Sequence, residues 1–363
     1  MKKLYRFFAL LTSIFFTNTY ASEYYSFVAS SDVMAPKILQ SFDLELDFLG
    51  EQDEQRVAIE SSAQYFLKRF ENSYTFIPII RNMIAKEGLP QEFLFVAMVE
   101  SEFIINAQSS KRASGIWQFM PNTAKSLGLE INDYIDERKD LIKSTRAALE
   151  YLKFLYEQMG QQWYLAVMAY NCGYGRLLKA IEQADGDTNL NTLLDEEKQY
   201  LPPETRNYIR KIVAMSLVFN DADFLKNNNL EYLLNRGATD TLATLKLKSG
   251  LPLGLVASSI GLSLNELRKY NMHFKYAFLP PGPADKEYNV YIPYEKLSLF
   301  RQNFDTNYKP NSAFILHKVQ KGETLTSISR QYKTTINELK RVNGLKNSFL
   351  SINQKLVIPI LKT

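Results

Sequence analysis

The chain has 363 residues, of which 46% are hydrophobic and 23% charged, and its formal net charge at pH 7 is +4. This length can supply the cores of two or three domains, and the small charge argues against nucleic acid as the main partner, because nucleic-acid binding calls for a strongly basic face. The single cysteine, Cys172, excludes an intramolecular disulfide, and the two distant histidines, His273 and His317, leave no basis for a zinc cluster or a histidine-based triad. We therefore expect a protein that is stabilised by packing and that uses no metal or other cofactor.

Residues 1–21 have the pattern of a secretory signal peptide. Lys2, Lys3 and Arg6 form a positive start, an apolar run follows, and the small residue Ala21 closes a plausible cleavage site. The apolar run is too short to span a bilayer, and no cysteine lies near the cleavage site to accept a lipid. We expect an exported protein, with an uncleaved membrane anchor as the alternative.

An N-terminal arm and a helical extension are predicted over residues 22–78. The alternation of Phe42, Leu44, Leu46 and Phe48 is typical of an extended segment. From residue 51 to 86 the apolar residues return at helical spacing, until Gly88 ends the helix and Pro90 begins the next one. More helices are expected over residues 142–159, 162–183 and 205–220.

An acidic residue closes one apolar helix. Residues 93–99 are all apolar, Glu100 follows them, and Phe93, Val96 and Ala97 share its helical face. Apolar surroundings and the negative end of the helix dipole both raise the pKa of a carboxyl group. A carboxylic acid that is protonated near neutral pH can donate a proton to a glycosidic oxygen. Glu100 is therefore a candidate general acid, and the alternative is a helix-end glutamate that is turned to water.

Four sequence blocks in order give this candidate a context. They are Glu100-Ser101, residues 115–124 with Gln118 and Met120-Pro121, Ala169-Tyr170-Asn171-Cys172-Gly173, and residues 201–208. Together they resemble the lytic murein transglycosylases of the soluble-lytic-transglycosylase type, which are related to goose-type lysozyme. The resemblance implies a mainly α, lysozyme-like catalytic domain, which we place at residues 79–222, and an enzyme exported to the periplasm and associated with the cell wall, with peripheral membrane association as an option.

The same resemblance implies a reaction and a set of substrate-binding residues. The β-1,4 bond between N-acetylmuramic acid and N-acetylglucosamine of peptidoglycan is cleaved without water. Glu100 acts first as the acid and then as the base on the C6 hydroxyl, which closes a 1,6-anhydro ring. Residues that match substrate-lining positions of the family are Ser101, Ser109, Gln118, Met120, Tyr170, Asn171, Glu204 and Tyr208.

Several assignments within this set have alternatives. Tyr170 is matched to the tyrosine that holds the reacting sugar, but it can also be a core aromatic, and packing is the alternative for Met120. Glu204 is interpreted as structural or subsite-lining, with Arg206 as the partner of a buried pair. Glu102 cannot readily supply a second carboxylate, because positions i and i+2 face different sides of a helix. A hydrolytic muramidase and a catalytically silent wall-binding protein therefore remain as alternative functions.

An internal repeat follows residue 235. At an offset of 72 residues, Gly250 pairs with Gly322 and Asn271 pairs with Asn343, and each copy ends in an apolar strand before a proline. Such matched elements indicate two copies of one small module. The copies are residues 240–295 and 315–360.

The second copy resembles the LysM family closely, and the whole chain then has the organisation of D-type membrane-bound lytic transglycosylases. The family fold is α+β, in the order strand–helix–helix–strand, and it binds polymers that contain N-acetylglucosamine. Asn353 stands where the family has glycine, and asparagine tolerates the positive φ that this turn needs. The first copy is more divergent, and for both copies a purely structural appendage is the alternative. The glycan-binding residues that the resemblance implies are Gly322, Glu323, Thr324, Leu325 and Asn343.

Overall fold

The computed structural model describes residues 34–45, 48, 75–230, 241–283, 285–305, 314–343, 345 and 347–359. The predicted signal peptide and residues 51–74 of the helical extension lie outside this part. Residues 34–40 are helical, residues 41–43 form a turn, and Phe48 lies in a 3-10 turn, so the predicted extended segment is wrong at Phe42 and Phe48. Within the described residues, no helix is both long enough and apolar enough to span a membrane.

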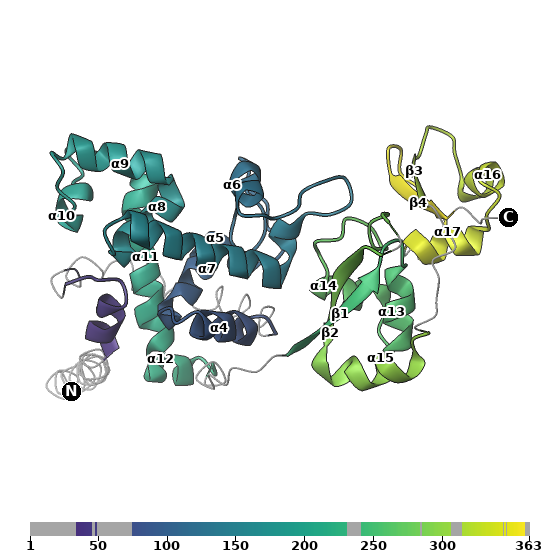
Figure 1. Cartoon of the computed structure of the whole chain (residues 1–363), viewed down its shortest axis with the longest axis horizontal. Helices are drawn as coiled ribbons and strands as arrows, with labels where there is room; N and C mark the ends of the chain where they lie inside the picture. Colours follow the sequence, from purple (N-terminus) through teal and green to yellow (C-terminus); the bar gives the residue numbers. More distant parts are fainter. Residues whose placement is uncertain are drawn as a thin grey trace, which may run out of the picture. The chain divides into compact units, whose positions relative to one another are not determined.

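Two compact units make up the chain. The first contains Met1–Tyr74, Ile84–Glu102 and Leu149–Gly237, and the second contains Thr75–Met83, Phe103–Ala148 and Ala238–Thr363. Helices dominate the first unit, and Figure 1 shows them as a bundle of short and long rods. Besides the helical residues 34–40, its described helices include α5 (Leu94–Ser101), α8 (Trp163–Cys172), α9 (Tyr174–Gln183), α10 (Leu190–Leu193), α11 (Pro203–Asn220) and α12 (Ala222–Asn227).

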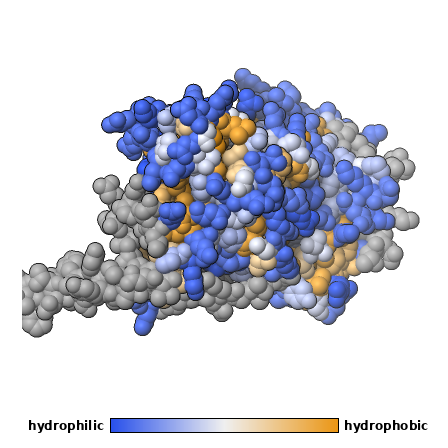
Figure 2. Space-filling view, turned by 60° about the vertical axis from the view of Figure 1, so that its left-hand side comes forward, coloured by the Kyte–Doolittle hydropathy of each residue, from blue (hydrophilic) through white to orange (hydrophobic). Residues whose placement is uncertain are grey.

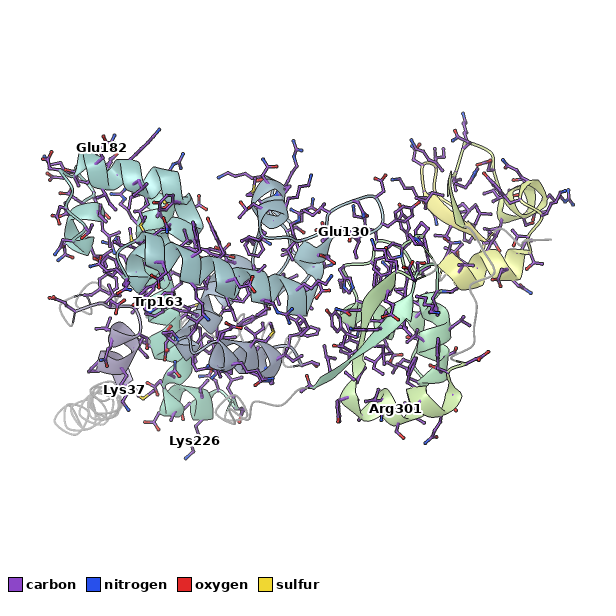
Figure 3. The ribbon with its side chains drawn as sticks, in the orientation of Figure 1. Lys37, Glu130, Trp163, Glu182, Lys226 and Arg301 are labelled. Carbon is purple, nitrogen blue, oxygen red and sulfur yellow. The ribbon has the colours of Figure 1, made fainter. Side chains whose placement is uncertain are left out.

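Helix α11 is the central element of the first unit and packs against α5 and α8. A ring contact joins α11 to α5, with Phe95 stacked on Phe219 at 6.3 Å. Phe93, which precedes α5, lies edge-on to Trp163 of α8 at 4.7 Å. Trp163, labelled in Figure 3, begins α8, and its backbone N–H donates to Asp43 Oδ2 at 2.8 Å. The predicted helix over residues 162–183 is two helices, because Gly173 at φ 90° breaks it between α8 and α9.

The second unit begins with helix and loop segments. Helix α4 (Ile77–Lys86) and helix α7 (Leu141–Gln158) each contribute residues to both units, while α6 (Pro121–Ser126) and the 3-10 turn η3 (Glu137–Lys139) lie in the second. Trp117 is fully buried here and its indole N–H donates to Thr145 Oγ1 at 3.0 Å. Trp117 is therefore a core residue of this unit.

The two repeated modules complete the second unit, and both have the predicted strand–helix–helix–strand order. In each module the two strands pair antiparallel, from Leu242↔Pro293 to Lys248↔Glu287 in the first and from Phe314↔Pro359 to Lys318↔Lys355 in the second. The first comprises β1 (Leu242–Lys248), α13 (Leu253–Ser259), α14 (Leu264–Tyr270) and β2 (Glu287–Pro293), followed by α15 (Leu297–Asn303). The second comprises β3 (Phe314–Lys318), α16 (Leu325–Gln331), α17 (Ile336–Asn343) and β4 (Lys355–Pro359). A mainly α half followed by small α+β modules is thus confirmed.

The repeated asparagines explain why both modules hold the same shape. The Asn271 side chain donates to Leu267 O at 3.0 Å and to Tyr291 O at 2.7 Å, and it accepts from Tyr291 N at 2.8 Å. Asn343 makes the equivalent bonds to Leu339 O and to the backbone of Val357, each at 2.8 Å. Each asparagine therefore ties the second helix of its module to the last strand.

Most apolar side chains are removed from the surface. Figure 2 shows a face that is mainly hydrophilic, with smaller hydrophobic areas between. The modules have their own apolar cores, one that includes Leu253, Val256 and Val290 and one that includes Leu325, Ile328 and Leu339. Burial of such side chains is the main force that stabilises each module.

Gly115 marks the tightest backbone contact of the second unit. It has φ +87°, and a Cβ atom built on it would lie 1.8 Å from Arg138 O. Gly128 has a similar φ of +77°, but a Cβ built there meets nothing within 4 Å. Any side chain at Gly115 therefore has to displace backbone, whereas one at Gly128 only has to accept a left-handed conformation.

We expect Gly115→Ala to lower the free energy of unfolding by on the order of 3 kcal/mol or more, from overpacking added to backbone strain. Gly128→Ala is the matched control and should cost about 1 kcal/mol, from strain alone. Urea unfolding of the two variants and the wild type measures both values. Equal losses in the two variants would contradict the close approach of Gly115 to Arg138.

Candidate active site

Glu100 lies in the last turn of α5, where the helix leaves the core. Residues 94–98 are all buried, and Glu100 itself is partly exposed. The helix ends at Glu102, whose φ of 51° is left-handed and whose N–H donates to Met98 O at 2.8 Å. Glu102 therefore leaves the helical path, and that it does not supply a second carboxylate remains a prediction.

Tyr208 of α11 holds the Glu100 carboxyl. Its hydroxyl donates to Glu100 Oε1 at 2.5 Å, and the tyrosine is only 6% exposed. Burial, and then the nearby charge of Glu100, raise the pKa of Tyr208 well above its usual value, so the phenol keeps its proton and remains a donor. This bond engages one of the two carboxyl oxygens, Oε1.

The environment raises the pKa of Glu100 from 4.5 to about 7. The main cause is burial of the carboxyl, and the charge of Glu204 adds to it, while the Tyr208 hydrogen bond and Lys211 act in the opposite direction. Acid and carboxylate are then both populated near neutral pH. A group in this range can donate a proton and take it back in the same turnover.

Tyr170 of α8 lies close enough to Glu100 for the carboxylate charge to change the pKa of its hydroxyl. Burial raises its pKa well above the usual value, and the charge of Glu100 contributes second. Its ring lies 5.7 Å from that of Tyr151. The structure therefore brings Tyr170 to the neighbourhood of Glu100, as the sequence indicated, and its contact with a sugar remains a prediction.

The residues around these groups serve the local structure. Ser101 is buried and its hydroxyl donates to Ala97 O at 3.3 Å, within α5. Asn171 Oδ1 accepts from the Thr205 hydroxyl at 2.8 Å, which joins the end of α8 to the start of α11. Asn171 and Gly173 thus shape this turn, and Cys172 is partly exposed.

The predicted buried pair of Glu204 and Arg206 is wrong. Glu204 is exposed in the first turn of α11, whereas Arg206 is buried and donates to Asp195 O at 3.2 Å. Side chains two residues apart diverge around a helix, so one faces water when the other faces the core. Glu204 acts on the site through its charge, which raises the Glu100 pKa.

Ser109, Gln118 and Met120 belong to the second unit. Ser109 Oγ accepts from Ala113 N at 3.0 Å, and the Gln118 side chain donates to Gly115 O at 2.7 Å from a residue with φ 48°. Met120 is 44% exposed, which argues against the packing alternative. Their place beside Glu100 remains a prediction.

A buried ion pair that supports this loop was missed from the sequence. Arg138 Nε and Nη2 donate to the two carboxylate oxygens of Asp136 at 2.9 and 2.8 Å, and Nη1 donates to Arg112 O at 2.8 Å and Phe119 O at 3.1 Å. Both charged residues are less than 8% exposed. The only sequence signal for this pair is that Asp136 and Arg138 are two positions apart. Such a spacing is common in exposed loops, so it does not predict a buried ion pair.

Two of the residues proposed for LysM glycan binding are structural in the second module. Leu325 is 2% exposed in the module core, and the Asn343 amide is bonded to backbone as described above. Gly322 has φ +87° and allows the turn, and Thr324 caps α16 by accepting from Ser327 N at 3.1 Å. Glu323 accepts from His317 Nε2 at 2.7 Å and from Gln320 N at 2.6 Å. Asn353 has φ 66°, which confirms that this turn has the positive φ expected where asparagine replaces the family's glycine.

In the described part of the chain, no group of three or more His, Cys, Asp or Glu residues could hold a metal ion. Among the described residues, the Glu100 carboxyl has the tyrosines Tyr208 and Tyr170 and the charges of Glu204 and Lys211 in its surroundings. Such groups can transfer a proton and donate hydrogen bonds to a neutral, hydroxyl-rich ligand.

Comparison with known families agrees with this geometry. The transglycosylase SLT domain matches residues 78–192, the LysM-like domain of the lytic transglycosylase MltD matches residues 241–309, and the LysM domain matches residues 317–359. The chain has the domain organisation of the D-type lytic transglycosylases. The SLT match confirms the predicted type of helical domain. The match to residues 241–309 extends beyond residue 295, the predicted end of the first module, and includes α15.

Individual relatives match the same parts. Membrane-bound lytic murein transglycosylase D of Escherichia coli (strain K12) is 31% identical over 297 residues, which are 77% of this chain and 62% of that protein. The chain thus spans about 62% of the length of this relative. Peptidoglycan transglycosylase gp16 of Escherichia phage T7 is 32% identical over 33% of this chain and 9% of its own. The crystal structure of the 70 kDa soluble lytic transglycosylase from Escherichia coli aligns with a TM-score of 0.33 at 22% identity, over 41% of this chain and 24% of that chain.

Neighbouring groups should shift the Glu100 pKa in opposite directions. Tyr208→Phe removes a hydrogen bond that favours the carboxylate, so we expect the pKa to rise above 7, and Glu204→Gln removes a nearby negative charge, so we expect it to fall. Carbon-13 NMR of the labelled carboxyl groups measures both. Glu182→Gln, at the exposed residue labelled on α9 in Figure 3, is the control and should leave the value unchanged.

Glu100 should also make stability depend on pH. Its folded-state pKa of about 7 lies above the ordinary value of 4.5, so between these values the folded protein binds more protons than the unfolded one. The stability linked to the protonated carboxyl is fully present below pH 4.5 and is lost as pH rises through 7. Urea unfolding should show that Glu100→Gln gains stability relative to the wild type from pH 5 to 8. A difference that does not change with pH would show that the carboxyl is not desolvated.

Proposed function

We propose that this protein is a lytic murein transglycosylase that cleaves the β-1,4 bond between N-acetylmuramic acid and N-acetylglucosamine and leaves a 1,6-anhydromuramic acid end. The observation that carries the proposal is the Glu100 carboxyl, whose pKa of about 7 results mainly from burial and which Tyr208 holds at 2.5 Å. The match to the SLT domain and the relationship to a lytic murein transglycosylase support the same substrate class.

The proposed reaction uses Glu100 twice. Its protonated carboxyl first gives a proton to the glycosidic oxygen as the bond from that oxygen to C1 of the muramic acid breaks. The C6 hydroxyl of the same sugar then attacks C1 and gives its proton to the Glu100 carboxylate. The enzyme returns to its starting protonation state, and no water enters the product. An attacking group that already belongs to the substrate has a very high effective concentration.

Tyr208 and Tyr170 have complementary roles in this proposal. Tyr208 bonds Oε1, so the carboxyl is oriented and Oε2 remains to exchange the proton with the sugar. The Tyr208 bond also strengthens as the carboxyl becomes charged after the first step. Tyr170 keeps its proton, because burial and the charge of Glu100 raise its pKa. Its hydroxyl can then donate a hydrogen bond to the acetamido group of the bound sugar.

The carboxylate geometry favours this reading over a hydrolytic muramidase. Hydrolysis by the common mechanism needs a second carboxylate as nucleophile or as the base for water. Glu204 is exposed on α11, and Glu102 leaves the α5 path at φ 51°. Within the first unit, these are the acids that the sequence blocks bring near Glu100, and neither has the enclosed setting of Glu100.

The LysM domain and the signal-peptide pattern are consistent with a protein that acts on the cell wall. The LysM domain at residues 317–359 is proposed to hold peptidoglycan strands and so to raise the local substrate concentration. We propose export to the periplasm, with association to the wall, from the signal-peptide pattern of residues 1–21.

The product tests the proposal directly. Digestion of purified sacculi in oxygen-18 water should give anhydromuramic acid ends without label, because the C6 hydroxyl supplies the new bond. Mass spectrometry of the released muropeptides measures the label and the loss of one water. Glu100→Gln should lower turnover by about 100-fold or more, since the amide cannot donate and reclaim a proton. Labelled, reducing muramic acid ends from the wild type would replace the transglycosylase with a muramidase.

A further inference from the structure

The two repeated modules use their equivalent loops differently. In the second module, the loop before β4 presents apolar side chains to solvent, with Phe349 85% and Ile352 60% exposed. The equivalent loop of the first module runs from Asn271 to β2, and Phe274, Ala277, Phe278 and Leu279 within it are all less than 5% exposed. Apolar side chains that are buried in this way need a partner surface.

Part of that partner surface is the first module itself. Gly250 N donates to Leu279 O at 3.2 Å, Leu279 N donates to Leu251 O at 2.8 Å, and Leu253 N donates to Ala277 O at 2.9 Å. These bonds join the loop to the turn that starts α13. In the second module, the turn at the equivalent position contains Gly322 and Thr324, and the family resemblance assigns it to glycan binding.

Another part of the partner surface is the second module, where Phe278 packs with Val342 and Val357. A third part is the segment of residues 130–140, which belongs to the SLT domain. Asp136 N donates to His273 O at 2.9 Å, and Lys275 N donates to Tyr134 O at 2.9 Å. Ile135 forms a β-bridge with Phe274 and is 1% exposed within the apolar core of the module. The segment thus pairs with the loop through one isolated β-bridge and the flanking backbone hydrogen bonds.

A buried hydrogen bond fixes the end of this segment. Tyr291 of β2 donates its hydroxyl to Asp140 at 2.9 Å, and Asp140 also accepts from Ile142 N and Lys143 N at 3.0 and 2.9 Å at the start of α7. Asp140 and Tyr291 are each 1% exposed. A buried carboxylate without donors is costly, so the module and the helix start satisfy it together.

The same segment supports the loop that carries Ser109 and Gln118. Arg138, held by Asp136, donates to the carbonyl groups of Arg112 and Phe119, and Gly115 lies against the Arg138 carbonyl. A continuous set of contacts therefore runs from β2, through residues 134–140, to residues 112–119. All of it lies within the second unit.

We propose that the first LysM-like module does not bind glycan, that its ligand is the 130–140 segment of its own chain, and that Tyr291 is a positioning residue for the substrate-binding loop of residues 109–120. The module then acts as a fixed support of the SLT domain, while wall binding is left to the second module. The statement about substrate rests on the proposed function, and the statement about the intramolecular ligand does not.

Hydrogen exchange measured by mass spectrometry on the full chain tests the contact without reference to activity. Tyr291→Phe should speed exchange in residues 107–119 and 130–140. Tyr332→Phe is the matched control, since it removes a tyrosine hydroxyl that bonds His317 Nδ1 at 3.0 Å in the second module, and it should leave these segments unchanged. In the wild type, tetra-N-acetylchitotetraose should not protect residues 250–253 or 272–283. Protection of those residues, or equal effects of the two variants, would overturn the proposal.

Kinetics on soluble glycan fragments separates positioning from loss of folded protein. Tyr291→Phe should raise KM by about fivefold or more with kcat within about twofold, because the loop binds sugar and Glu100 supplies the chemistry. Sedimentation with insoluble peptidoglycan should be unchanged, and Tyr332→Phe should keep the wild-type KM. A fall in kcat alone, or a wild-type KM, would contradict the positioning role.

Asp140→Asn is the second variant if Tyr291→Phe does not fold. Its amide oxygen still accepts from Tyr291, so it should give the same changes at smaller amplitude. An effect of Asp140→Asn on KM without faster exchange in residues 107–119 would also overturn the proposal. If the wild type makes no anhydro ends, the proposed function fails, while the exchange results still decide the intramolecular contact.

Discussion

The central constraint on this protein is the placement of a carboxyl group at the end of a buried apolar helix. Residues Leu94 to Met98 of helix α5 are buried in the core of the first unit. Glu100 follows in the last turn of the helix, where it is only partly exposed to water. An ionised carboxylate there needs a donor, and Tyr208 of α11 supplies it. The balance between desolvation and this one bond sets the pKa near 7. Packing of α11 against α5 therefore determines the chemistry as well as the fold.

In the second unit, the main constraint is to hold the loop of residues 103–120 in one conformation, because this loop has little regular secondary structure. Residues 103–120 contain several left-handed residues, among them Arg112, Gly115 and Gln118. In this loop the carbonyl groups of Arg112 and Phe119 accept hydrogen bonds from the buried Arg138, whose charge is balanced by Asp136. A buried ion pair of this kind adds little net stability, but its geometry selects one conformation of the loop. The first LysM-like module in turn contacts residues 134–140, the segment that contains this ion pair.

Sequence reasoning was most successful where the signal is local or repeated. The periodicity of residues 142–159 and 205–220 predicted α7 and α11 to within two residues at each end, and the 72-residue offset predicted both modules. It failed where a side chain can face either way. Glu204 was expected in a buried pair and is exposed. Leu325 and Asn343, which were expected to bind glycan, also hold the second module together, and their contact with glycan remains a prediction. A motif gives the position of a residue along the chain, but the packing of its helix decides which way it points.

The sequence by itself determined the helical class of the first half, the duplicated module and the candidate acid, because each depends on the order and spacing of nearby residues. Only the tertiary structure decided the partner of that acid, since Tyr208 is 108 residues away from Glu100 in the chain. The same is true of Asp140 and Tyr291, which are 151 residues apart. Hydrogen bonds across such separations depend on how whole helices and strands pack, and no local pattern records them. The pKa of Glu100, which is the sum of burial and these distant partners, is for that reason a property of the fold.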